Sequence, residues 1–276
     1  MAILFGIIVG LALGLTGGGG SIFAVPLLIY GLGMAAKDAV VVSLAAVALT
    51  TAFGTLTALR ADLVEWRPGL IFAVTGIAAA PLGLAAGKHM SDSFLVLGFA
   101  VLALLVAVAM WRKAIREPAN AVVVRAGLGR DAGGTGAVCS YSPDGVLRVT
   151  ARCSLMLALV GGCSGLLSGL FGVGGGFIIV PTLMFITQMR IHQAVATSLL
   201  VITLVGLSGV GSELLQGRDL PWRHTGLFVL GGLLGMGLGR LWARRIAGPL
   251  LQKGFAAAIL IVAAAMITAH FTRTLL

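Results

Sequence analysis

The chain has 276 residues, of which 59% are hydrophobic and 10% charged, and its mean hydropathy is +1.08. Soluble domains carry about 25% charged residues, so this composition excludes a soluble globular protein and indicates one embedded in a lipid bilayer. The formal net charge is +10, but the sequence has no basic stripe with interleaved aromatic residues. We therefore expect no nucleic-acid partner and assign the excess of basic residues to membrane topology.

The apolar runs are long enough to cross a bilayer as helices, which takes about 20 residues each. We therefore predict an all-α integral membrane fold. The expected spans are Ala39 to Ala58, Gly69 to Gly87, Phe94 to Trp111, Gln193 to Ser212, Gly226 to Trp242 and Leu250 to Ala269.

One segment precedes these spans and occurs twice in the chain. The first copy has four consecutive glycines at 17–20 and a proline at Pro26, and the second has glycines within 172–176 and Pro181. Glycine and proline inside an apolar helix are costly unless the break itself is needed. Each copy is therefore predicted to form a glycine-broken helix or a helical hairpin.

A shift of 155 residues aligns Leu15–Leu44 with Leu170–Leu199 without a gap, and 12 of the 30 positions are identical. A shift of 156 then matches Trp66 with Trp222. The chain is therefore predicted to contain a first transmembrane repeat at 1–112, a linker at 113–152 and a second repeat at 153–276.

The orientation of the two repeats depends on the glycine segments. If each segment is one full crossing, the repeats are parallel and the basic residues divide 12 to 7 between the two sides. If each folds back, the repeats are inverted and the division is 14 to 5. The positive-inside rule favours two inverted repeats, with the linker cytoplasmic and both termini outside.

The linker contains a Pro-Asp-Gly turn at 143–145 between short β-prone runs, which predicts a small hairpin. The three cysteines show no metal-ligand spacing, so neither a disulfide framework nor a zinc site is expected. Four threonines in the span from Ala39 either bond to their own helix or line a pathway. These are Thr50, Thr51, Thr55 and Thr57.

Broken helices at mid-membrane usually line a cavity, and paired ones in two repeats point to a transporter's substrate site. A helix N-terminus offers free N–H groups to an anion, and glycine lets the anion approach. Close helix packing is the alternative use of these glycines. The candidate substrate-binding residues are Gly18, Gly19, Gly20, Ser21, Ser43, Gly174, Gly175, Gly176, Thr197 and Ser198, with Pro26 and Pro181 fixing the helix breaks.

Other chemistries receive no support from the sequence. The second glycine cluster lacks the lysine and hydroxyl residue of a phosphate-binding loop. The spans contain no nucleophile or acid–base pair, so we expect no catalytic residue, no metal site, no cofactor and no enzyme activity. No carboxylate lies in the middle of a span, and the coupling ion, H⁺ or Na⁺, is left open.

The segment Gly172–Pro181, its first-half copy and the following Ala196-Thr197-Ser198 resemble the TauE/SafE sulfite-exporter family of membrane permeases. The resemblance covers both halves and omits most of the linker. It implies a secondary transporter, an exporter or permease, in the cytoplasmic (inner) membrane. Its cargo would be small sulfur-containing anions such as sulfite, sulfonates or sulfoacetate, moved by alternating access. An anion channel and an intramembrane enzyme or assembly subunit are the alternatives, and a homodimer is an assembly that the sequence leaves open.

Overall fold

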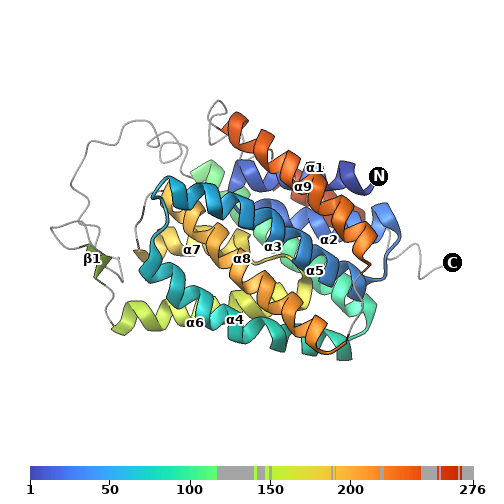
Figure 1. The fold of residues 1–276 in the computed structure, drawn as a ribbon, viewed down its shortest axis with the longest axis horizontal. Coiled ribbons are helices and arrows are strands. Elements are labelled where there is room, and N and C mark those ends of the chain that lie inside the picture. The colour runs from blue at the N-terminus through green and yellow to red at the C-terminus, as the bar shows by residue number, and fades with distance from the viewer. Residues whose placement is uncertain are drawn as a thin grey trace.

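The computed structural model describes residues 1–116, 140–141, 147–148, 151–187, 189, 191–217, 221–243, 254, 256–266 and 268. These residues are almost entirely helical (Figure 1). The first repeat contains α1 Ala2–Thr16, η1 Gly19–Phe23, α2 Ala24–Pro26, η2 Leu27–Gly31, α3 Ala36–Arg60, α4 Trp66–His89 and α5 Asp92–Arg116. The second contains α6 Ala151–Phe171, α7 Gly176–Thr187, α8 Ile191–Leu215 and α9 Trp222–Ala243, followed by a shorter apolar helix, Ala256–Met266.

Within the described residues, five helices are long and apolar enough to cross a membrane: Ala36–Arg60, Trp66–His89, Ala151–Phe171, His192–Leu215 and Trp222–Trp242. The all-α membrane class is therefore confirmed. Four of these helices coincide with expected spans, whereas α6 lies before the second glycine cluster. Large leucine and phenylalanine side chains remain exposed along the outer faces of the helices, as expected for surfaces that meet lipid.

The first glycine segment folds back on itself. A Cβ atom added to Gly20 would meet the backbone of Ala12 and Leu13, and one added to Gly31 would meet the ring of Phe5. The chain from Gly19 to Gly31 therefore runs antiparallel to α1. The 15 residues of α1 span only about 22 Å, which is less than the roughly 30 Å of a bilayer core. The segment is a helical hairpin.

Each hairpin packs against the other half of the chain, with α1 on α9 and α6 on α4. The two seams use glycine at the same helical spacing. Gly10 approaches the backbone of Gly232 on α9, and its equivalent Gly165 approaches Gly76 on α4. Gly6 and Gly14 extend the first seam, as Gly161 and Gly169 extend the second. Small residues allow two helix backbones to touch, so these glycines serve packing.

The relative direction of the repeats is visible in the bundle. In Figure 1, α1 begins at the end marked N, whereas the equivalent helix α6 begins at the opposite end, beside β1. Two contacts agree with this direction. Lys88 Nζ lies 2.7 Å from Gln216 Oε1 at one end, and Gln193 Nε2 lies 3.0 Å from Glu65 Oε1 at the other. Parallel repeats would place the partners of each pair on opposite sides, so the fold is consistent with inverted repeats.

Two features concern the linker and its surroundings. β1 Ser140–Tyr141 pairs antiparallel with β2 Leu147–Arg148, as the Pro-Asp-Gly turn predicts. The rest of the segment between Arg116 and Ala151 lies outside the described residues. Cys153 is buried and disulfide-bonded, which the cysteine spacing did not indicate, because spacing does not show which thiols approach in space. Cys163 is a free, exposed thiol.

The glycine seams predict a position-specific loss of stability. In Gly165→Ala, the new Cβ would overlap the carbonyl of Gly76, so we expect the free energy of unfolding to fall by about 1–3 kcal/mol. Gly162→Ala is the matched control on the same helix, because nothing lies within 4 Å of its Cβ. Thermal unfolding of the purified variants measures the difference. Equal stability of the two variants would contradict the seam.

The orientation of the repeats predicts a labelling pattern. Asp92→Cys and Gly217→Cys should react with an impermeant thiol reagent from the same side of the membrane, because both flank the Lys88 end. Asp62→Cys and His192→Cys, near the contact between Glu65 and Gln193, should react from the other side. The experiment uses sealed vesicles of both orientations. Labelling of Asp92→Cys and Gly217→Cys from opposite sides would exclude inverted repeats.

Candidate functional site

The two helix breaks have the same backbone geometry. Gly17 ends α1 with φ +73°, and its equivalent Gly172 ends α6 with φ +70°. This left-handed conformation is strained for other residues. In both cases the amide bonds back to the carbonyl four residues earlier, Gly17 to Leu13 at 2.7 Å and Gly172 to Ser168 at 2.8 Å. Glycine at these two positions lets each helix end in a short cap.

A serine from the opposite half then completes each cap. Ser43 on α3 donates its hydroxyl to the carbonyl of Gly172 at 2.6 Å, and Ser198 on α8 donates to the carbonyl of Gly17 at 2.9 Å. Both serines are fully buried. Both serines contact the glycine segments, and their hydroxyls are bonded to the protein. In this structure they position the glycine segments.

The two glycine segments meet at the interface between the halves. A Cβ on Gly18 would lie 3.0 Å from the Cα of Gly176, and one on Gly176 would lie 2.7 Å from the Cα of Gly18. A Cβ added to Gly174 would lie 3.8 Å from the Cβ of Ser21. The candidate residues of the two clusters therefore form one buried junction at the centre of the bundle.

Free amides also gather at this junction. The helix α7 begins at Gly176, and the first N–H groups of a helix have no acceptor within it. Among the described residues, the amides of Gly174, Gly175 and Gly176 find no hydrogen-bond acceptor elsewhere. Such amides favour negative charge, and the partial positive charge of the helix N-terminus adds to the effect.

Other predicted residues take structural contacts. The Ser21 hydroxyl donates to the carbonyl of Gly18 at 2.9 Å, and the Gly20 amide donates to the Thr16 hydroxyl at 3.2 Å. Thr197 lies away from the junction, where its hydroxyl accepts the amide of Glu65 at 3.0 Å at the start of α4.

The two prolines lie inside the second arms of the hairpins rather than at the breaks. Pro26 lies in α2 and Pro181 in α7. The breaks themselves are made by the glycines, which adopt backbone angles that proline cannot. A role for the prolines in fixing the angle of the arms remains a prediction.

A cluster of buried threonines joins the halves beside the junction. The Thr203 hydroxyl on α8 lies 3.0 Å from that of Thr51 and 3.2 Å from that of Thr55, both on α3. Thr51 and Thr55 also donate to carbonyls of their own helix, as does Thr57. The back-bonding expected for membrane threonines is therefore present. Thr203 was not singled out, because its cross-half partners depend on helix rotation.

The junction is closed in this conformation. A cavity with a volume of about 10 Å³ lies nearby, lined by Val25, Val40, Phe99, Phe171 and other apolar residues. It is too small and too apolar for an oxyanion.

Comparison with known proteins bears on the family of the chain. The family model "Sulfite exporter TauE/SafE" matches residues 2–266. A "Probable membrane transporter protein" of Xylella fastidiosa is 34% identical over 261 residues, covering 93% of this chain and 90% of that protein. The "Probable membrane transporter protein YunE" of Bacillus subtilis is 26% identical over 254 residues, covering 88% of both chains. No solved structure matches.

The family match, two broken-helix hairpins and the membrane-spanning helices lead to one conclusion. The chain belongs to the sulfite exporter TauE/SafE family of membrane transporters.

Proposed function

We propose that the chain is a secondary transporter of small sulfur-containing anions, such as sulfite, sulfonates or sulfoacetate. The observation that carries the proposal is the junction where Gly18 meets Gly176 and where the amides of Gly174 to Gly176 are free. A tetrahedral or pyramidal oxyanion presents several acceptor oxygens to converging N–H groups. Because the donors are backbone amides, one site would accept several related anions.

The way in which the halves are joined supports alternating access. Each hairpin packs on a span of the other half through a glycine seam, so hairpin and partner helix would move as a unit. Rocking of one unit against the other would separate the glycine tips toward one side at a time. The serine bonds from Ser43 and Ser198 would hold the shape of each tip during this motion.

Substrate identity is tested by thermal unfolding of the purified protein with sulfite, sulfonates, sulfate and carboxylates, each with and without sodium. Sulfite or a sulfonate should raise the melting temperature in a saturable manner, because a ligand stabilises the state that it binds. Gly18→Ala should remove this shift, since its Cβ would lie 3.0 Å from Gly176 and block the approach of an anion. Gly211→Ala, with nothing within 4 Å, is the control.

Three outcomes oppose the proposal, two from this experiment and one from an uptake assay. A shift that survives unchanged in Gly18→Ala would place the binding site elsewhere. A shift with carboxylates alone would exclude sulfur anions as the substrate class. Uptake that does not saturate in vesicles would favour the channel alternative.

The serine bonds predict a second mutational pattern. Ser43→Ala or Ser198→Ala leaves a buried glycine carbonyl unpaired, so each should lower the free energy of unfolding by about 1–3 kcal/mol even without substrate. Ser212→Ala, whose hydroxyl bonds only within its own turn at 2.7 Å from Gly209, should have little effect. If Ser43→Ala weakens anion binding without changing apo stability, the serines contact substrate directly.

A further inference from the structure

Glu213 is the one charged side chain that is fully buried among the described residues. It lies on α8, near the end of the helix, and its side chain is 1% exposed. One turn earlier, Val210 packs against Val40, Val41, Leu44 and Leu84. A carboxylate in apolar surroundings is costly unless it is paired, and ionisable groups inside membrane bundles usually have a function.

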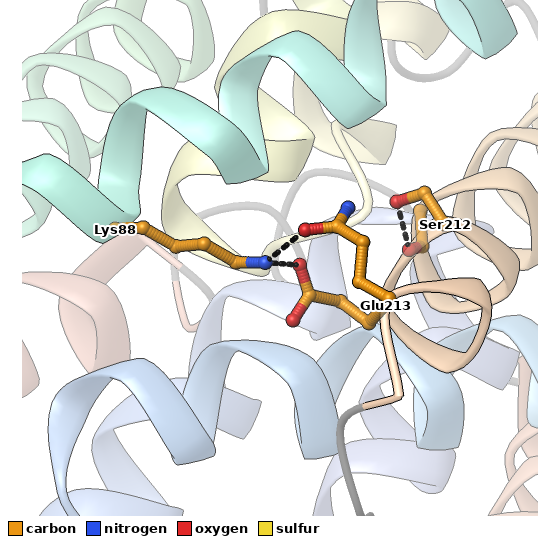
Figure 2. A network of polar contacts seen from close by, with 5 residues as sticks. Lys88, Ser212 and Glu213 are labelled. Atoms are coloured by element: carbon orange, nitrogen blue, oxygen red, sulfur yellow. Dashed lines mark hydrogen bonds and ion pairs between the residues drawn. The ribbon is translucent and has the colours of Figure 1, made fainter.

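The partner is Lys88, which comes from the other half of the chain. Lys88 Nζ lies 2.7 Å from Glu213 Oε1 and 2.7 Å from Gln216 Oε1 (Figure 2). The carbonyl of Lys88 accepts a hydrogen bond from Lys37 Nζ at 3.0 Å. The pair therefore ties the ends of α4 and α8 together and touches the start of α3. It closes one end of the bundle across the interface between the halves.

The opposite end has no equivalent of this carboxylate. The 155-residue shift that relates the halves places Ala58 at the position of Glu213. Ala58 is buried in an apolar cluster with Val64, Ala196 and Leu200. The end that contains Ala58 is instead bridged by contacts that include the hydrogen bond from Gln193 to the half-buried carboxylate of Glu65. Among the described residues, an ion pair with a fully buried carboxylate is found only at the Lys88 end.

We propose that the ion pair between Lys88 and Glu213 latches its end of the bundle, and that Glu213 takes up a proton when this end opens. The inference rests on the proposed alternating access. When the halves separate, Lys88 keeps its own proton and moves toward water, while Glu213 stays on an apolar face. Breaking a buried pair leaves an uncompensated charge, and a proton from water on that side, bound to the carboxylate oxygen, removes it.

This coupling supplies what the sequence lacked, a proton carrier linked to one step of the transport cycle. Opening of the Lys88 end is favoured at low pH on that side and opposed at neutral pH. The other titratable or charged side chains on the helix ends near this pair are Lys37 and Asp38 on α3, His89 on α4 and Asp92 at the start of α5. Asp38, His89 and Asp92 are exposed. His89 is the group whose own titration must be separated from that of Glu213.

The test measures opening with a reporter thiol. Ser212→Cys places a half-buried thiol beside Glu213 (Figure 2), in the full-length protein with Cys163→Ser. The labelling rate is measured between pH 7.5 and pH 5, after subtraction of labelling in the parent without the reporter. Each rate is divided by that of the same reporter with Glu213→Gln, which cancels the intrinsic pH dependence of the thiol.

At pH 7.5, Glu213→Gln should label about tenfold faster than the protein with Glu213, because the latch is lost. The ratio should rise toward one as the pH is lowered, because a proton on the Glu213 carboxylate removes the charge that holds the latch. Lys88→Gln should open the end at neutral pH as well, and Lys88→Arg should restore closure. His89→Gln, and Glu65→Gln at the opposite end, should behave like the protein with Glu213. A ratio near one at pH 7.5, or a pH response that disappears in His89→Gln, overturns the proposal.

The assay needs no substrate, so it separates the two proposals. A working latch with no anion-induced stabilisation would contradict the proposed substrate and leave the latch standing. Saturable sulfite binding with labelling that does not respond to Glu213→Gln would reject the latch alone. Should Glu213→Gln fail to fold, Lys88→Gln and Lys88→Arg carry the same test.

Discussion

The fold depends on how a broken helix keeps its backbone satisfied inside a membrane. A break frees carbonyls and amides, and in lipid each unsatisfied group costs several kcal/mol. Here the freed carbonyls of Gly17 and Gly172 are each bonded by a serine hydroxyl from the opposite half. The carbonyls are therefore paired within the protein, whereas the amides of the second cluster find no acceptor among the described residues. A junction with bonded carbonyls and available N–H groups favours anions over cations.

The two halves of the chain share their packing contacts but differ in several of their polar contacts. The glycine seams and the two serine bonds repeat in both halves with the same residue types. Among the described residues, the ion pair at Lys88, the threonine cluster at Thr203 and the bond from Gln193 to Glu65 have no counterpart in the other half. A symmetric protein would adopt two conformations of the same shape, one open at each end of the bundle. Unequal polar contacts make these two conformations differ in energy.

Much of the fold could be predicted from residue patterns. The long spans followed from composition, and the sequence shift predicted two repeats. Loop charge favoured inverted repeats, but the sequence left open whether each glycine segment is a broken helix or a hairpin. The use of Ser43 and Ser198 could not be predicted in the same way, because a serine looks identical whether it faces a ligand or caps a carbonyl. Thr197 was misplaced for a similar reason: its neighbour Ser198 points to the junction, but one residue of helix turns the side chain by about 100°.

The regular spacing of Gly6, Gly10 and Gly14, repeated at Gly161, Gly165 and Gly169, was visible in the sequence and carried a packing signal. It was overlooked because the four-glycine clusters dominated the pattern. The pairing of Lys88 with Glu213 had no sequence signal, since 125 positions separate the two residues and only the bundle brings them together.

The crossed packing of the hairpins has a consequence for the origin of such a chain. Neither half contains the surface on which its own hairpin rests, since α1 rests on α9 and α6 rests on α4. A single half would therefore have to find a second copy inserted in the opposite direction before its glycine seam could form. Gene fusion through a polar linker turns that chance encounter between oppositely inserted copies into an intramolecular event, with both copies always present at one to one.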